Sequence, residues 1–120
     1  MGSIKSKKMM TQKESFSQLK KFDTEQKILK SLADTQARTI LFSIIERGKT
    51  TIDLFKEHEI PISSIYKKIS ELEDLGLIRI EKRIIANRGK KFKVYKSRIS
   101  GARINIKSSR PMINLFPNSD

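Results

Sequence analysis

Side chains that bind phosphate are concentrated in the last third of this 120-residue chain. Between Leu77 and Arg110 there are twelve lysines and arginines and one acid, Glu81, so this stretch holds a net +11 of the formal +13. Ammonium and guanidinium groups bind phosphate oxygens through charge-assisted hydrogen bonds. The sequence therefore predicts a polyanionic partner, with nucleic acid as the first candidate.

A helix expected near residues 61–75 offers one set of candidate binding residues. Hydroxyl groups can donate to phosphate or to a base edge, a tyrosine ring can touch a thymine methyl, and lysine can reach guanine or phosphate. The competing interpretation is that two lysines on an exposed helix are only a solvated face. The candidates on the outward side of this helix are Ser63, Ser64, Tyr66, Lys67 and Lys68.

A basic hairpin that follows this helix offers the second set. Arg88 is expected at the tip of a loop at about 86–91, where arginine suits a narrow and electronegative minor groove. Lys90 and Lys91 are expected to contact phosphates. Arg79 and Arg83 are expected on one strand face beside the DNA backbone, or else to pair with Glu81 or cover apolar surface with their stems.

Four helices and a hairpin are expected to position these residues. Asp23 and Gln26 fit a capping box at a first helix. Asp34 can cap a second helix that ends at Gly48, and Thr50 or Thr51 a third that ends near His58. The fourth begins at Pro61 and stops at Gly76, after which the apolar pattern changes to period two.

The predicted core is small, because the apolar fraction is only 37%. Phe42 and Phe55 are assigned to it, as are Ile52 and Leu54, and Tyr95 is expected to pack. Phe92, Val94 and the isoleucines of the hairpin strands are also assigned to the core and not to base stacking. His58 is expected to be an ordinary surface residue. We predict an α+β fold that is mainly α with a small β-hairpin.

Three segments are expected along the chain. Residues 1–22 form a basic arm that is partly disordered, in which the stripe of Phe16, Leu19 and Phe22 can form a short helix, and residues 23–98 form the binding domain. Residues 99–120 form an extension in which 102–106 can be a short strand, whereas 112–116 can be an anchoring tail or no element.

The order helix, helix, helix, hairpin resembles a winged helix-turn-helix domain. The stretch ILKSLADTQARTILFSII (28–45) resembles the opening of arsenic-repressor-like (ArsR-like) regulators, and TIDLFKEHEIPISSIYKKISELEDLGLI (51–78) resembles their helix-turn-helix. Archaeal winged-helix regulators with a Pro-x-Ser-x-x-Tyr recognition helix are similar too. The resemblance implies major-groove binding by residues 61–75, a wing at 86–91 on the adjacent groove or backbone, and a homodimer.

Several chemistries are not expected. Metal-sensing members use cysteine or histidine-rich ligand sets, whereas this chain has no cysteine and one histidine, so neither a metal nor another cofactor is predicted. No serine–histidine pair or glycine-rich phosphate loop is evident, which argues against an enzyme. Apolar runs such as 40–45 are too short to cross a bilayer, so a cytoplasmic, nucleoid-associated protein is predicted.

Three functions compete for this sequence. The first is a transcriptional regulator that binds specific duplex DNA as a dimer. The second is an architectural or chromatin protein with little sequence preference, since phosphate neutralisation is indifferent to base sequence. The third is a winged-helix module that binds protein or RNA within the transcription machinery.

Overall fold

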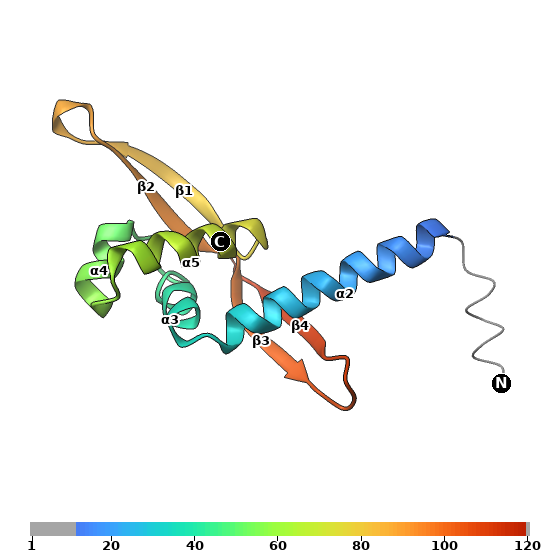
Figure 1. Ribbon diagram of the computed structural model, residues 1–120. Coiled ribbons are helices and arrows are strands. Elements are labelled where there is room, and N and C mark those ends of the chain that lie inside the picture. Colours follow the sequence, from blue (N-terminus) through green and yellow to red (C-terminus); the bar gives the residue numbers. More distant parts are fainter. Residues whose placement is uncertain (1–11, 120) are drawn as a thin grey trace, which may run out of the picture.

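A computed structural model describes residues 12–119 of the chain, with side chains described from residue 20 onward (Figure 1). Within that range the fold comprises four α-helices and two antiparallel hairpins, which confirms the expected α+β class. The elements are α2 (Gln12–Ala33), α3 (Thr35–Ser43), α4 (Thr51–His58), α5 (Ile62–Asp74), β1 (Ile78–Ile85), the 3-10 turn η1 (Asn87–Gly89), β2 (Lys91–Ser97), β3 (Ile99–Asn105) and β4 (Met112–Pro117).

Helix α2 begins earlier than expected. It is continuous from Gln12 to Ala33, so Asp23 lies in its interior and the capping box predicted there is wrong. The stretch 12–22 has no proline or glycine and is rich in straight-chain residues that favour helix, so nothing breaks the helix before Asp23. Residues 1–11 of the predicted arm lie outside the described residues.

The caps of α3 and α4 are confirmed. The Asp34 carboxylate accepts a hydrogen bond from the Ala37 amide at 2.8 Å. Thr50 and Asp53 form a reciprocal capping box, in which the hydroxyl accepts from the Asp53 amide and the carboxylate accepts from the Thr50 amide. Helix α3 ends at Ser43, well before Gly48, because Ile44 already leaves the helical conformation with φ −113° and ψ 21°.

Helix α5 and its stop signal also match the prediction. Pro61 is the N-cap, and Ile65, Ile69 and Leu72 form the buried stripe. Gly76 has φ +74°, the left-handed conformation that glycine adopts most easily at the end of a helix. The chain then enters β1 within two residues, so the helix and the first hairpin form one connected unit.

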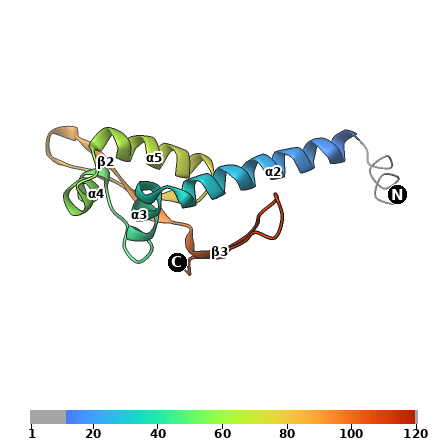
Figure 2. The same ribbon diagram turned by 60° about the horizontal axis from the view of Figure 1, so that its bottom comes forward.

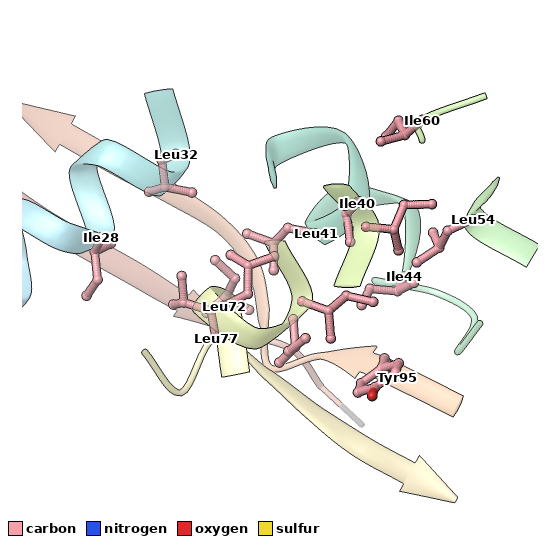
Figure 3. Packing of buried hydrophobic residues seen from close by; sticks show 14 residues of the cluster. Ile28, Leu32, Ile40, Leu41, Ile44, Leu54, Ile60, Leu72, Leu77 and Tyr95 are labelled. Carbon is pink, nitrogen blue, oxygen red and sulfur yellow. The ribbon is translucent and has the colours of Figure 1, made fainter. Parts of the chain in front are cut away.

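The core lies between the three short helices, the last turns of α2 and the base of the β1–β2 hairpin (Figure 3). Ile40, Leu41 and Leu54 are fully buried there, and Tyr95 packs against the cluster as expected. Lys49 forms a β-bridge with Tyr95, so a short segment before α4 joins the free edge of β2.

The core assignment of the strand isoleucines is wrong for Ile84 and Ile85. Ile84 is 41% exposed and Ile85 is 70% exposed, because β1 extends beyond the core from Glu81 onward.

Three helix residues assigned to the core by sequence are also exposed. Phe42 is 40% exposed, Phe55 is 45% exposed, and Ile52 is also exposed. Helix α4 is two turns long and buries only the stripe of Thr51 and Leu54, which lie three residues apart on one face. Residues 52 and 55 each follow a buried residue by one position and are therefore turned about 100° away from it.

The end of the chain forms a second hairpin that the sequence indicated only in part. The strand expected at 102–106 is present as β3, and the 112–116 segment is its partner β4. Asn118 fastens the hairpin to the core, because its side-chain amide donates to the carbonyls of Ile45 (2.8 Å) and Ser97 (3.1 Å). This hairpin runs alongside α2 and away from the β1–β2 hairpin (Figures 1 and 2).

Arg110 connects the tip of the second hairpin to α2. Its guanidinium lies 3.6 Å from the Glu25 carboxylate and 5.5 Å from the centroid of the Phe22 ring. The two contacts hold the β3–β4 turn against the helix by charge and by cation–π attraction.

The Asp34 cap gives a testable pH dependence. The Ala37 amide lowers the pKa of Asp34 from 3.8, with opposition from burial and help from Lys68. A folded-state pKa below the unfolded one adds stability above about pH 3.8, and this is lost as pH falls through the folded pKa. Asp34→Ala should therefore lower the free energy of unfolding by about 1 kcal/mol near neutral pH.

Urea unfolding at about pH 7 and about pH 3 measures this difference. Asp34→Asn is the matched control, because its amide oxygen still caps the helix but carries no charge. The variant should lose less stability than Asp34→Ala near neutral pH. A gap between Asp34→Ala and the parent that stays constant at both pH values would contradict the role of the carboxylate.

Candidate nucleic-acid interface

The outward face of α5 is set by the position of its buried stripe. At 3.6 residues per turn, Ser63, Lys67, Ser70 and Asp74 point opposite to Ile65, Ile69 and Leu72. All four outward residues are exposed. Ser70 is not among the sequence candidates, although it lies three residues after Lys67 and seven after Ser63, which is a spacing that marks one face.

Tyr66 lies on the flank of α5 and is exposed. Its hydroxyl accepts a hydrogen bond from the Thr51 hydroxyl at 3.4 Å, at the start of α4. The first turn of α4 thus fixes the direction of the Tyr66 ring. This leaves the ring surface accessible beside Ser63 and Lys67.

The structure separates Lys68 from Lys67. The Lys68 ammonium lies 3.4 Å from the Asp34 carboxylate and 4.0 Å from that of Glu71, and its side chain is only 20% exposed. Ser64 is half-buried on the same flank. Lys68 therefore faces the start of α3 and supports the fold at that point.

Arg79 and Arg83 lie on opposite faces of the first hairpin, so their expected shared face is wrong. Ile80 pairs with Tyr95 and Lys82 with Val94, which leaves Glu81 as an extra residue in a β-bulge. The extra residue shifts the alternation of side chains by one position. Arg79 then pairs with Lys96, whereas Arg83 pairs with Lys93 on the other face.

The face that carries Arg83 is the one that meets α5. Nearer the core, Ile78, Ile80 and Tyr95 lie on this face. Burial, together with the charges of Glu73 and Tyr66 on α5, raises the pKa of Tyr95, and Arg83 opposes them, so these four groups lie within electrostatic range. Lys93 belongs to this face too, although it was not among the candidate site residues.

The tip of the hairpin presents the remaining three candidates. Arg88, Lys90 and Lys91 are all exposed. The loop is closed by hydrogen bonds from the Ala86 amide to the Lys90 carbonyl (2.7 Å) and from the Gly89 amide to the Ala86 carbonyl (3.2 Å). Arg88 and Gly89 both have positive φ, 68° and 75°, so the tip has a defined and tightly turned backbone.

Electrostatics favour one half of α5 as the contact surface. Glu71, Glu73 and Asp74 lie in its last turn, whereas Ser63, Tyr66 and Lys67 lie in its first half. The three carboxylates of the last turn repel a polyanion, whereas Lys67 and the cations of the hairpin attract it. What we term the basic surface consists of Ser63, Tyr66 and Lys67 of α5, Arg83 and Lys93 of the hairpin, and the three cations of the tip.

A serine–histidine contact is present that the sequence did not reveal. The Ser43 hydroxyl lies 2.9 Å from Nε2 of His58, and it also accepts from the Lys49 ammonium at 2.9 Å. Lys49 in turn donates to the Glu57 carboxylate at 2.6 Å. These residues join the ends of α3 and α4, so half-buried His58 contributes to the fold.

Lys96 is a second buried polar anchor. Its ammonium donates to the Glu46 carbonyl at 2.8 Å and lies 3.9 Å from the Glu81 carboxylate. The contacts fix the 46–49 segment against β2 beside the bulge. Lys96 therefore lies outside the basic surface despite its position in the cationic stretch.

No group of three or more potential metal ligands occurs in the part of the chain that the structure describes. No helix within that part is both long and apolar enough to cross a bilayer. A groove of about 740 Å³ lies between α2 and α5, and its lining mixes lysines such as Lys27 and Lys30 with carboxylates such as Glu71 and Asp74. This mixed lining gives no preference for an anionic cofactor.

No protein-family model and no curated protein matches this chain. The resemblance to ArsR-like and archaeal regulators therefore stays a prediction, and the functional argument depends on the basic surface itself.

Proposed function

We propose that this protein is a winged-helix regulator of transcription that binds duplex DNA. The observation that carries the proposal is the basic surface. The hairpin face that packs against α5 near the core bears cations farther out, so that these cations and the helix lie on one side of the molecule. A helix beside a basic ribbon matches the way in which such domains contact a major groove and the neighbouring groove or backbone.

The order of the elements supports the winged-helix assignment. Helix α3 is followed by the bridge at Lys49, then α4, α5 and the β1–β2 hairpin, with the bridge on the free edge of β2. Helices α4 and α5 supply the helix-turn-helix, and the hairpin supplies the wing.

Dimensions support the docking as well. Along the regular strand β2, the pair Ile85–Lys91 lies four residues beyond the pair Ile80–Tyr95, where the hairpin leaves the core, which is roughly 14 Å at about 3.4 Å per residue before the turn adds its own length. That reach is close to half of the roughly 34 Å helical repeat of duplex DNA. With α5 in the major groove, the tip extends to the adjacent minor groove.

We also propose that the chain acts as a homodimer, since one such domain reads only a short half-site. Large apolar side chains remain exposed on the second hairpin, including Met112, Leu115 and Phe116. A second copy would cover them beside α2. A clean monomer by light scattering at tens of micromolar, with and without DNA, would contradict the dimer.

The outward face of α5 gives a prediction about sequence preference. Replacing Tyr66 and Lys67 together by alanine should reduce the ratio of specific to non-specific affinity, because a good base contact contributes about 1–3 kcal/mol of discrimination. Titrations of a preferred and a scrambled duplex measure the ratio. Lys68→Ala is the control, since Lys68 faces Asp34. An equal loss on both duplexes would contradict base readout by α5.

The decisive experiment for the function is selection of bound duplexes from a random DNA pool at near-physiological salt. Enrichment of an inverted repeat would support a dimeric regulator. Retention without enrichment would favour the architectural alternative, which the serine-rich outward face of α5 also suits. Failure to retain any duplex would redirect the proposal to a protein or RNA partner.

We further propose that the protein is no enzyme and acts in the cytoplasm at the nucleoid. The location follows from the DNA-binding role, in which the partner is genomic DNA.

A further inference from the structure

Ile85 is an apolar side chain at the solvent-exposed tip of the β1–β2 hairpin, where polar side chains would be expected. Ile85 is 70% exposed, more than any other large hydrophobic residue with a described side chain. It pairs with Lys91 as the last rung of the hairpin before the turn. No core residue reaches it, because β1 is exposed from Glu81 onward.

The surroundings of Ile85 are cationic and lack acids. The sequence from Lys82 to Ser119 contains no aspartate or glutamate. Arg83, Lys91 and Lys93 share the face of Ile85, and Arg88 lies in the adjoining turn. Ile85 is thus an apolar side chain surrounded by cations. A DNA duplex is complementary to this arrangement, because its phosphates are anionic and its stacked bases are apolar.

Ile85 has the chemistry of a wedge between base pairs. Proteins that enter the minor groove often insert an apolar side chain such as isoleucine, leucine or phenylalanine between two base pairs, which unstacks the step and kinks the duplex. Flanking cations bind the phosphates on either side and so favour closure of the bend. Ile85 projects on the α5-facing side of the hairpin, the side that is turned toward the duplex when α5 occupies the major groove.

We propose that Ile85 is a minor-groove wedge and that this protein bends the duplex it binds. The inference rests on the proposed DNA-binding function and deepens it, because it assigns a deformation step to a residue outside the recognition helix. A flexible pyrimidine–purine step under the wing is the expected insertion point. Specificity then includes DNA deformability at base pairs that α5 does not touch.

The test is resonance energy transfer between dyes at the two ends of a duplex of about 30 base pairs with a central TA step. The full chain should raise the transfer efficiency in accordance with a bend of about 20–90°. Ile85→Ala should bind with the same salt slope, show about threefold to tenfold weaker affinity, and lose most of the bend. Ile85→Leu should restore the bend, since leucine is also an effective wedge.

Ile84→Ala is the matched control. Ile84 is the adjacent isoleucine, is 41% exposed, and pairs with Phe92 on the opposite face of the hairpin. The Ile84→Ala variant should bend DNA as the parent does. The thermal unfolding temperatures of all variants should coincide, because neither residue 84 nor residue 85 is in the core.

Each other outcome counts against the wedge. Binding without bending by the parent would overturn the wedge and leave DNA binding intact. Equal bends by Ile85→Ala and the parent would do the same. No binding of the parent to any duplex would overturn the proposed function together with the wedge.

Discussion

A chain in which Arg88, Lys90 and Lys91 are all alanine is expected to lose affinity for every duplex, preferred or not. These three cations lie at the exposed tip of the first hairpin, and each can neutralise one phosphate. With about 1 kcal/mol for each contact, the loss should be on the order of a hundredfold. The slope of log affinity against log salt should flatten by about 3, because each lost phosphate contact removes about 0.9.

Titrations of two unrelated duplexes at several salt concentrations measure both effects. A triple alanine variant of Arg98, Arg103 and Lys107 is the matched control, since it removes the same charge from the same third of the chain. These residues lie in or next to the second hairpin, which extends away from the first (Figure 1). If both variants lose affinity equally, net charge governs binding and the basic surface has no special role.

Leu72→Ala is expected to have the largest effect on stability. Leu72 is fully buried in the last turns of α5 and lies in the cluster that joins α3, α5 and the start of β1. Truncation removes buried methyl groups and leaves a cavity, which typically costs about 2–5 kcal/mol. Because small domains have only about 5–15 kcal/mol of stability, a measurable fraction of the variant should be unfolded.

Denaturant unfolding followed by circular dichroism measures this loss. Phe55→Ala is the control, since it removes a larger side chain that is 45% exposed on α4. It should cost less than about 1 kcal/mol, in line with surface substitutions. An equal cost for both variants would show that Phe55 is in the core, as the sequence predicted, and would contradict the packing of α4.

The elements that local chemistry specifies could be predicted from sequence. The Asp34 and Thr50 caps, the stripe of α5 and the left-handed Gly76 each depend on residues within a few positions of one another. The period of two after Gly76 predicted the first hairpin, and the loop at 86–91 is where the structure turns. For the same reason the sequence predicts the position of Arg88 and Lys90 in the turn, whereas Lys91 is the first residue of β2.

Features that depend on contacts between residues far apart in the chain could not be predicted from the sequence. Phe42 and Phe55 are apolar, but the core was already filled by Ile40, Leu41 and Leu54 from the same helices. The burial of Lys96 depends on the Glu46 carbonyl, fifty positions away. Strand β4 needed β3 as its partner and Asn118 as its fastening, and neither is visible in a six-residue apolar stretch.

The prediction of the candidate site from sequence failed at one point, because β1 contains one residue more than its partner strand. An even alternation along 79–83 put Arg79 and Arg83 together, and only the pairing with β2 reveals the bulge at Glu81. The same bulge brings Arg83 beside Lys93 on the basic surface. Lys68 illustrates a second limit, since its partner Asp34 is the N-cap of another helix, α3.

The bulge at Glu81 also divides the hairpin into two parts in which substitutions should have different consequences. Before it, Ile78 and its partner Ser97 are buried, and changes there disturb the fold. Beyond it, every β1 side chain is exposed, so most substitutions should change stability by no more than about 0.5 kcal/mol. New binding preferences can therefore arise in the outer part by single substitutions, while selection on the inner part preserves the domain.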